Sequence, residues 1–205
     1  MNTWTDFNDA EQQQGFDLIP KGTTVKVRMT IKPGGHDDPA QGWTGGYATQ
    51  SFDTGSVYLA CEFVVLEGPY ARRKMWSNIG LHSPKGPAWG NMGRSMIRGI
   101  LNSARNVHPQ DNSPQAASAR RIQGFHELDG IEFLARVDVE KDAKGEERNV
   151  VKLAIEPDHK DYAALMGVPS KSPTSGGSAV APAPAAPQQA NAQRLAVPGK
   201  PAWAQ

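Results

Sequence analysis

The chain has 205 residues, a formal net charge of +1 and a single cysteine. This length allows one folded domain of about 100 to 200 residues plus an appendage. It contains no run of 18 or more apolar residues, and Asp6, Asp9 and Glu11 stand where a secretory signal needs basic and then apolar residues. We therefore expect a soluble cytoplasmic protein with no membrane partner. Because Cys61 is the only cysteine and lies in an apolar run, we expect a buried thiol rather than a disulfide or a Cys-based zinc site.

Although the net charge is small, acidic and basic residues are segregated along the chain. Residues 1–20 carry four acidic and no basic side chains, and residues 106–167 carry twelve acidic against eight basic. Residues 21–105 reverse this balance, with eleven basic against five acidic. This pattern permits an electropositive face on a nearly neutral molecule.

The first predicted element is a strand over residues 23–32. Apolar Val25, Val27, Met29 and Ile31 alternate with polar residues, most of them cationic, which is typical of a half-buried strand. Residues 33–55 follow as a long glycine-rich loop that holds aromatic residues. Loops of this length in compact domains are usually functional or disordered. We expect the loop aromatics either to clamp a ligand or to pin the loop to the domain, and we favour the clamp.

A hairpin is predicted next. Residues 56–68 alternate around Leu59, Cys61 and Phe63, Gly68 and Pro69 form a turn, and residues 73–81 form a second strand. Residues 82–91 read as a loop, and apolar residues at helical spacing predict a helix over 92–107. After a polar connection at 106–124, strands over 131–142 and 147–157 are joined by the turn at 142–145 as a second hairpin.

The predicted fold class is mainly β. Five short strands with a helix between the third and fourth form the element order of the OB-fold, a small, partly open barrel. We assign residues 1–167 to this domain. Residues 168–205 are rich in Pro, Ala, Ser, Gly and Gln without an acidic residue, and cannot bury enough apolar surface to offset the entropy of ordering, so we predict a disordered tail.

The candidate site is the outward side of the strands. Single-stranded nucleic acid needs cations along its phosphates and flat side chains on which bases stack. Cations and aromatics fall on one side of the pleat and aliphatic residues on the other. The candidate nucleic-acid-binding residues are Lys26, Arg28, Lys32, Trp43, Tyr47, Tyr58, Arg72, Arg73, Lys74, Trp76, Arg136 and Lys152. We interpret Arg94 and Arg98, four residues apart in the predicted helix, as a solvated stripe.

Catalytic motifs do not stand out. The five histidines are scattered, without an HExxH, GxxxxGK[ST] or GxSxG pattern. His36, Asp37 and Asp38 form the one cluster with metal-ligand chemistry, but no further carboxylate follows at a defined spacing. We predict a protein that is not an enzyme and needs no metal or cofactor.

The chain also resembles a family of phage and mobile-element proteins related to single-stranded DNA-binding proteins, long catalogued as a domain of unknown function. The family's aromatic lead, first strand and hairpin are matched by these positions: Trp4, Phe7, Ala10, Pro20, Gly22, Val25, Val27, Leu59, Phe63, Val65, Gly68, Tyr70 and Arg73. The resemblance covers roughly residues 1–160. It implies an OB-fold that binds single-stranded DNA in replication or recombination of a mobile element in a bacterial host cell. The chain departs from this pattern in its long first loop and in a tail that ends in PGKPAWAQ.

We therefore predict a protein that binds single-stranded DNA with little sequence preference. The alternative is an adaptor of the same fold that binds replication or recombination proteins, with the tail as the contact. The sequence leaves open the choice between DNA and RNA and the assembly of a homo-oligomer.

Overall fold

The structure is a computed structural model that describes residues 7–8, 17–142 and 144–168. The chain divides into two units, Met1–Ser170 and Lys171–Gln205, and all described residues belong to the first. Apart from Val168, the predicted tail lies outside the described residues, as do Trp4 and Ala10.

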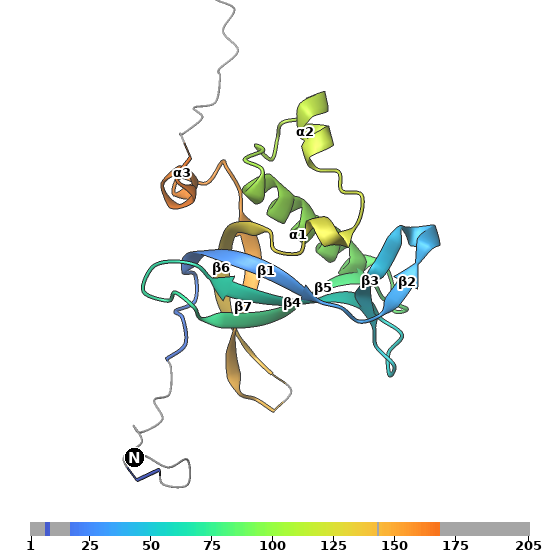
Figure 1. The fold of residues 1–205 in the computed structure, drawn as a ribbon, viewed down its shortest axis with the longest axis horizontal. Helices are drawn as coiled ribbons and strands as arrows, with labels where there is room; N and C mark the ends of the chain where they lie inside the picture. Colours follow the sequence, from blue (N-terminus) through green and yellow to red (C-terminus); the bar gives the residue numbers. More distant parts are fainter. Residues whose placement is uncertain (1–6, 9–16, 143, 169–205) are drawn as a thin grey trace, which may run out of the picture. The chain divides into compact units, whose positions relative to one another are not determined.

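The described residues form a mainly β fold with short helices (Figure 1). The strands are β1 (Thr24–Lys32), β2 (His36–Asp38), β3 (Trp43–Gln50), β4 (Val57–Val65), β5 (Lys74–His82), β6 (Glu132–Lys141) and β7 (Glu147–Ile155). The α-helices are α1 (Ala88–Ala104), α2 (Pro114–Ala119) and α3 (Tyr162–Met166), and the 3-10 turns are η1 (Pro39–Gln41) and η2 (Phe125–Glu127).

One antiparallel sheet is strongly curled. Its order is β2-β3-β4-β1-β6-β7, and β5 pairs with β4 outside this path. The β4–β5 and β6–β7 hairpins are those expected from the turns at Gly68–Pro69 and 142–145. Across the curl, the Val151 N–H of β7 donates to the Ser77 Oγ of β5 at 3.1 Å. The two ends of the sheet therefore approach each other around a common core.

The core confirms the alternation expected from the sequence. Val27, Met29, Leu59 and Phe63 are buried on the inner face, while the residues between them face outward. The Phe63 ring contacts the Phe133 ring edge-on, with centroids 6.0 Å apart. Such aromatic contacts add stabilisation beyond the area they bury.

Cys61 belongs to the same core. Burial raises the pKa of its thiol to about 12, with a further contribution from the Asp129 carboxylate. The predicted burial of Cys61 is confirmed, and the raised pKa disfavours the thiolate, which is the reactive form.

Helix α1 packs against the end of β5 through glycines. A Cβ at Gly93 would lie 1.7 Å from the Gly80 carbonyl oxygen, and one at Gly90 would lie 2.6 Å from the Leu81 carbonyl oxygen. The absence of side chains at these two positions lets the helix backbone contact the strand backbone. The helix begins at Ala88 rather than at Met92, because this backbone contact, and not apolar spacing, positions its first turns.

The expected count of five strands is wrong, because the described residues include β2 and β3 inside the predicted 33–55 loop. Hydrogen bonds explain this hairpin: the Gly46 N–H donates to Asp37 at 2.7 Å, and the Gly35 N–H donates to the Gly46 carbonyl at 2.8 Å. Gly45 and Gly46 have positive φ angles, which glycine adopts without steric cost. Their presence made the segment read as a loop.

Helix α3 was not expected. Its Tyr162 is buried against Leu134 and Ile155, which project from the side of β6 and β7 opposite the main core. The helix therefore covers part of the outer side of the curled sheet. β1, β4 and β5 carry further exposed residues on that side.

Candidate nucleic-acid interface

The outward side of β1, β4 and β5 is a continuous surface, called here the outer sheet face. It consists of Lys26, Arg28, Thr30, Lys32, Tyr58, Glu62, Lys74, Trp76 and Asn78. Strand pairing places Thr30 opposite Glu62, and Glu62 opposite Trp76. The same register aligns Arg28, Val64 and Lys74 in the next row. Arg28 and Lys74 therefore lie in the row next to Trp76, and Glu62 lies directly opposite its ring.

Trp76 is unusually accessible for a tryptophan. The residue is 56% exposed, whereas tryptophan residues in folded proteins are usually largely buried. The indole N–H donates to Glu62 Oε2 at 3.2 Å, which orients the ring without covering its surface. The ring is thus held in place and open to solvent.

Carboxylates partly neutralise the cations of the outer sheet face. Glu62 pairs with Lys74 at 3.0 Å, and Glu132 pairs with Arg28 at 2.6 Å and with Lys26 at 3.8 Å. Exposed ion pairs of this kind contribute only about 0–1 kcal/mol, so a phosphate can replace the carboxylate at small cost. Lys32 has no ion-pair or hydrogen-bond partner among the residues that the structure describes.

Some predicted site residues lie elsewhere. Tyr47 is half-buried and packs against the main core, which supports the pinning alternative for this residue over the predicted clamp. The Arg136 side chain lies against the segment that precedes α3, and its guanidinium contacts His159 Nε2 at 3.0 Å. Lys152 pairs with Glu140 on the β6–β7 hairpin at 3.4 Å. The structure does not bring these residues onto the outer sheet face.

The turn between β4 and β5 uses its two arginines differently. Arg72 is exposed and has a φ angle of 69°, a left-handed conformation that is uncommon outside glycine. The Arg73 guanidinium donates to the carbonyl of Asp17 and so ties the turn to the segment before β1. Tyr70 is half-buried against the core and anchors the turn. Only Arg72 extends the basic character of the turn into solvent.

Trp89, at the start of α1, contacts Tyr58 of the predicted site. Its ring fills the space beside Gly80, where a Cβ would lie 2.5 Å from the ring. Its centroid lies 6.3 Å from that of Tyr58, so Tyr58 is half-buried. Gly80 was the feature of the sequence that could have indicated this contact, because a glycine leaves room for a neighbouring ring. Only the register of β4 and β5 shows which ring occupies the space beside Gly80.

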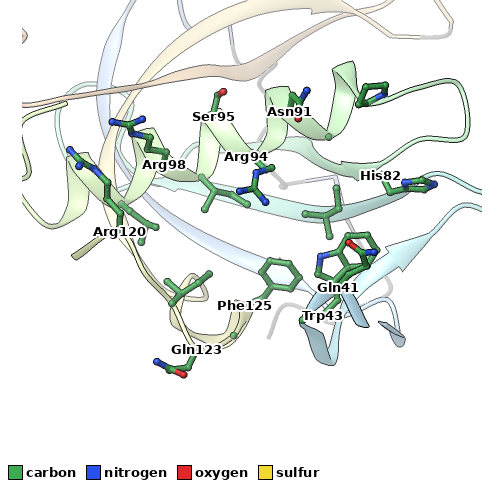
Figure 2. Close-up of a pocket in the computed structure, with 18 of the residues that line it drawn as sticks. Gln41, Trp43, His82, Asn91, Arg94, Ser95, Arg98, Arg120, Gln123 and Phe125 are labelled. Carbon is green, nitrogen blue, oxygen red and sulfur yellow. The ribbon is translucent and has the colours of Figure 1, made fainter. Parts of the chain in front are cut away.

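A second surface was also missed. Between α1, the η1–β3 segment and the α2–η2 segment lies a groove of about 1040 Å³, called here the α1 groove (Figure 2). Figure 2 shows Arg94 projecting from α1 toward the segments that carry Trp43 and Phe125, whereas the Arg98 side chain points toward the Arg120 side of the groove. Both arginines are exposed, as the predicted solvated stripe requires, and both line the groove.

The only residue cluster with metal-ligand chemistry that the sequence offered has local structural roles. Asp37 accepts from Gly46, Asp38 accepts from the Ala40 N–H at the start of η1, and the His36 ring lies 6.4 Å from the Trp43 ring. No group of three His, Cys, Asp or Glu residues suited to a metal ion occurs within the described ranges. In the same ranges, no helix is long and apolar enough to cross a membrane.

Replacing Glu62 tests the balance of charge on the outer sheet face. We expect Glu62→Gln to raise affinity for single-stranded DNA several-fold, because it frees Lys74 while Gln retains an acceptor for the Trp76 N–H. Each phosphate contact changes the slope of log K against log salt by about 0.7 on single strands, so the salt dependence should steepen by about that amount. The measurement is fluorescence anisotropy with labelled dT30 at several salt concentrations.

The matched control is Asp158→Asn, which removes the same charge from an exposed position before α3. An equal gain in both variants would mean that net charge alone is measured. Unchanged affinity in Glu62→Gln would contradict contact between Lys74 and phosphate.

Comparison with known proteins adds no family assignment. No protein-family model matches the chain, and no curated protein matches it.

Proposed function

We propose that the protein is a non-enzymatic single-stranded DNA-binding protein of the OB-fold type. It binds with little sequence preference and protects single-stranded DNA during replication or recombination of a phage or mobile element. Its bound strand follows the outer sheet face, with bases against Trp76 and phosphates near Arg28, Lys32 and Lys74.

The connectivity of the long strands supports the OB-type assignment. β1 pairs with β4 and β6, β4 pairs with β5, and β6 pairs with β7. The Ser77–Val151 hydrogen bond brings β5 beside β7, and α1 lies between β5 and β6 in the chain. These pairings support a barrel of the OB type, in which the second and third strands are the usual place for oligonucleotides. β2 and β3 are then an elaboration of the first connection.

One observation carries the proposal: the exposed Trp76 ring lies beside the row of the outer sheet face that holds Arg28 and Lys74. A ring 56% exposed forgoes much of the stabilisation that burial would bring, and base stacking on a protein surface needs such a ring. If this face of β5 contacted only solvent, threonine or lysine at position 76 would suit it equally well.

The experiment is a titration of the full chain with labelled dT30, the corresponding RNA and duplex DNA at two salt concentrations, with tryptophan fluorescence followed in parallel. We expect binding of dT30 with quenching, weaker binding of duplex, and an affinity that falls as salt rises. The RNA arm decides which single strand is preferred.

Absence of binding to every nucleic acid at low salt would overturn the proposal. Binding of duplex as tight as that of dT30 would also overturn it, because base stacking requires unpaired bases. In the first case, the adaptor alternative predicts that replication or recombination proteins bind the chain and that truncation after Gly167 abolishes this binding.

A further inference from the structure

The α1 groove combines features that suit a ligand with both anionic and aromatic parts. Its lining includes Arg94, Arg98, Arg120 and His82, and none of the described residues that line it is Asp or Glu. Amide side chains of Gln41, Asn91, Asn112 and Gln123 also line it, together with the Trp43 ring. At about 1040 Å³, it lies at the upper end of the range of about 300–1,000 Å³ usual for ligand pockets.

The arginines that line the groove differ in the number of hydrogen bonds that they make within the protein. Arg120 is committed to the fold, since its guanidinium donates to Asn102 at 2.7 Å, to the Asp111 carbonyl at 2.6 Å and to the His108 carbonyl at 2.8 Å. Arg98 donates to the Pro109 carbonyl at 3.0 Å. The Arg94 guanidinium has no hydrogen-bond or ion-pair partner among the residues that the structure describes. An arginine has five donors, so Arg94 is a free binding group for an anion.

The groove lies at the end of β5, the strand that carries Trp76. Trp76 pairs with the outward Glu62, whereas a register shift near the end of β5 pairs His82 with the buried Val57, and Leu81 and His82 line the groove. Six residues of strand span about 20 Å. A ligand that lies over Trp76 and follows β5 for this distance reaches the end of the strand, where Leu81 and His82 line the groove.

We infer that the α1 groove holds a further segment of the same single-stranded nucleic acid, with a phosphate at Arg94 and a base beside Trp43. This inference rests on the proposed function. Amide side chains pair with base edges, and Arg pairs with phosphate, so the groove offers partners for every part of a nucleotide. A peptide of acidic residues alone would pair with the arginines but bring no ring to stack on Trp43, whereas every nucleotide carries both a phosphate and a base, which is why nucleic acid is favoured.

Arg94→Gln is the decisive variant, because an exposed side chain without a partner can be replaced without loss of a fold contact. We expect its affinity for dT30 to fall about ten-fold, the effect of one charge-assisted hydrogen bond. Its salt slope should decrease by about 0.7. The matched control is Arg121→Gln, whose exposed side chain does not line the groove, and it should bind like the unmodified chain.

Photocrosslinking gives a readout that does not depend on affinity. With an oligonucleotide that carries bromodeoxyuridine, we expect crosslinks at Trp43 or His82 as well as at Trp76, mapped by mass spectrometry. Crosslinks confined to Trp76, with Arg94→Gln binding like Arg121→Gln, would overturn the inference and leave the proposed function intact.

Two other outcomes separate the proposals. Loss of binding in Arg94→Gln with full binding in Trp76→Ala would mean that the groove is the binding site and that the sheet-face assignment is wrong. Absence of nucleic-acid binding would overturn both proposals. In that case, a labelled poly-glutamate probe tests for a peptide site. Specific binding of this probe, displaced by unlabelled peptide, in the unmodified chain but not in Arg94→Gln would identify the groove as a peptide site.

Discussion

Trp76→Ala should lower the affinity for dT30 about 5-fold to 150-fold, because a base stacked on an aromatic side chain contributes about 1–3 kcal/mol. Stability should change little, since the ring is 56% exposed and its N–H donates only to the exposed side of Glu62. The two measurements are fluorescence anisotropy with labelled dT30 and the midpoint of urea unfolding.

Two matched variants make this result specific. Trp76→Phe keeps a stacking ring and should retain most of the affinity, whereas a role limited to the Glu62 hydrogen bond would make it as weak as Trp76→Ala. Phe52→Ala removes a fully exposed ring from the β3–β4 turn. An equal loss in Phe52→Ala would show that any exposed aromatic residue contributes and would contradict a defined stacking position.

Gly93→Ala should destabilise the protein by about 2–3 kcal/mol, toward the upper end of the usual cost of overpacking. In an ordinary helix, the same change is favourable by about 1 kcal/mol. Here the added Cβ would lie 1.7 Å from the Gly80 carbonyl oxygen, a backbone atom that cannot move aside as a side chain can. Helix α1 would have to shift away from β5. Urea unfolding of the full chain measures the change.

Gly99→Ala is the control within the same helix. Its Cβ would meet the Ala154 Cβ at 3.4 Å, an ordinary contact, so we expect unchanged or slightly increased stability. If Gly93→Ala were as stable as Gly99→Ala, the close contact between α1 and β5 would be wrong. Because Arg94 follows Gly93 directly, a displaced helix should also weaken any ligand contact in the α1 groove.

The alternation of side chains was readable from the sequence because it depends only on the pleat of a strand. Val27, Met29 and Phe63 are buried and Arg28 and Trp76 face outward, as their parity in the chain requires. The turn at Gly68–Pro69 likewise predicted the β4–β5 hairpin from local chemistry. The mainly β class and the outward row of cations follow from these local rules.

Tertiary structure alone decided which outward residues meet. The ion pair between Arg28 and Glu132 joins β1 to β6, strands distant in the chain, and no local pattern specifies their register. The α1 groove likewise forms between segments around residues 42, 94 and 123, which are far apart in the chain. From the sequence alone, Arg94 is predicted to be an ordinary solvated residue, because the segments that face it are not known. Local periodicity determines which face a side chain occupies, whereas its partners depend on long-range packing that a single strand or helix does not encode.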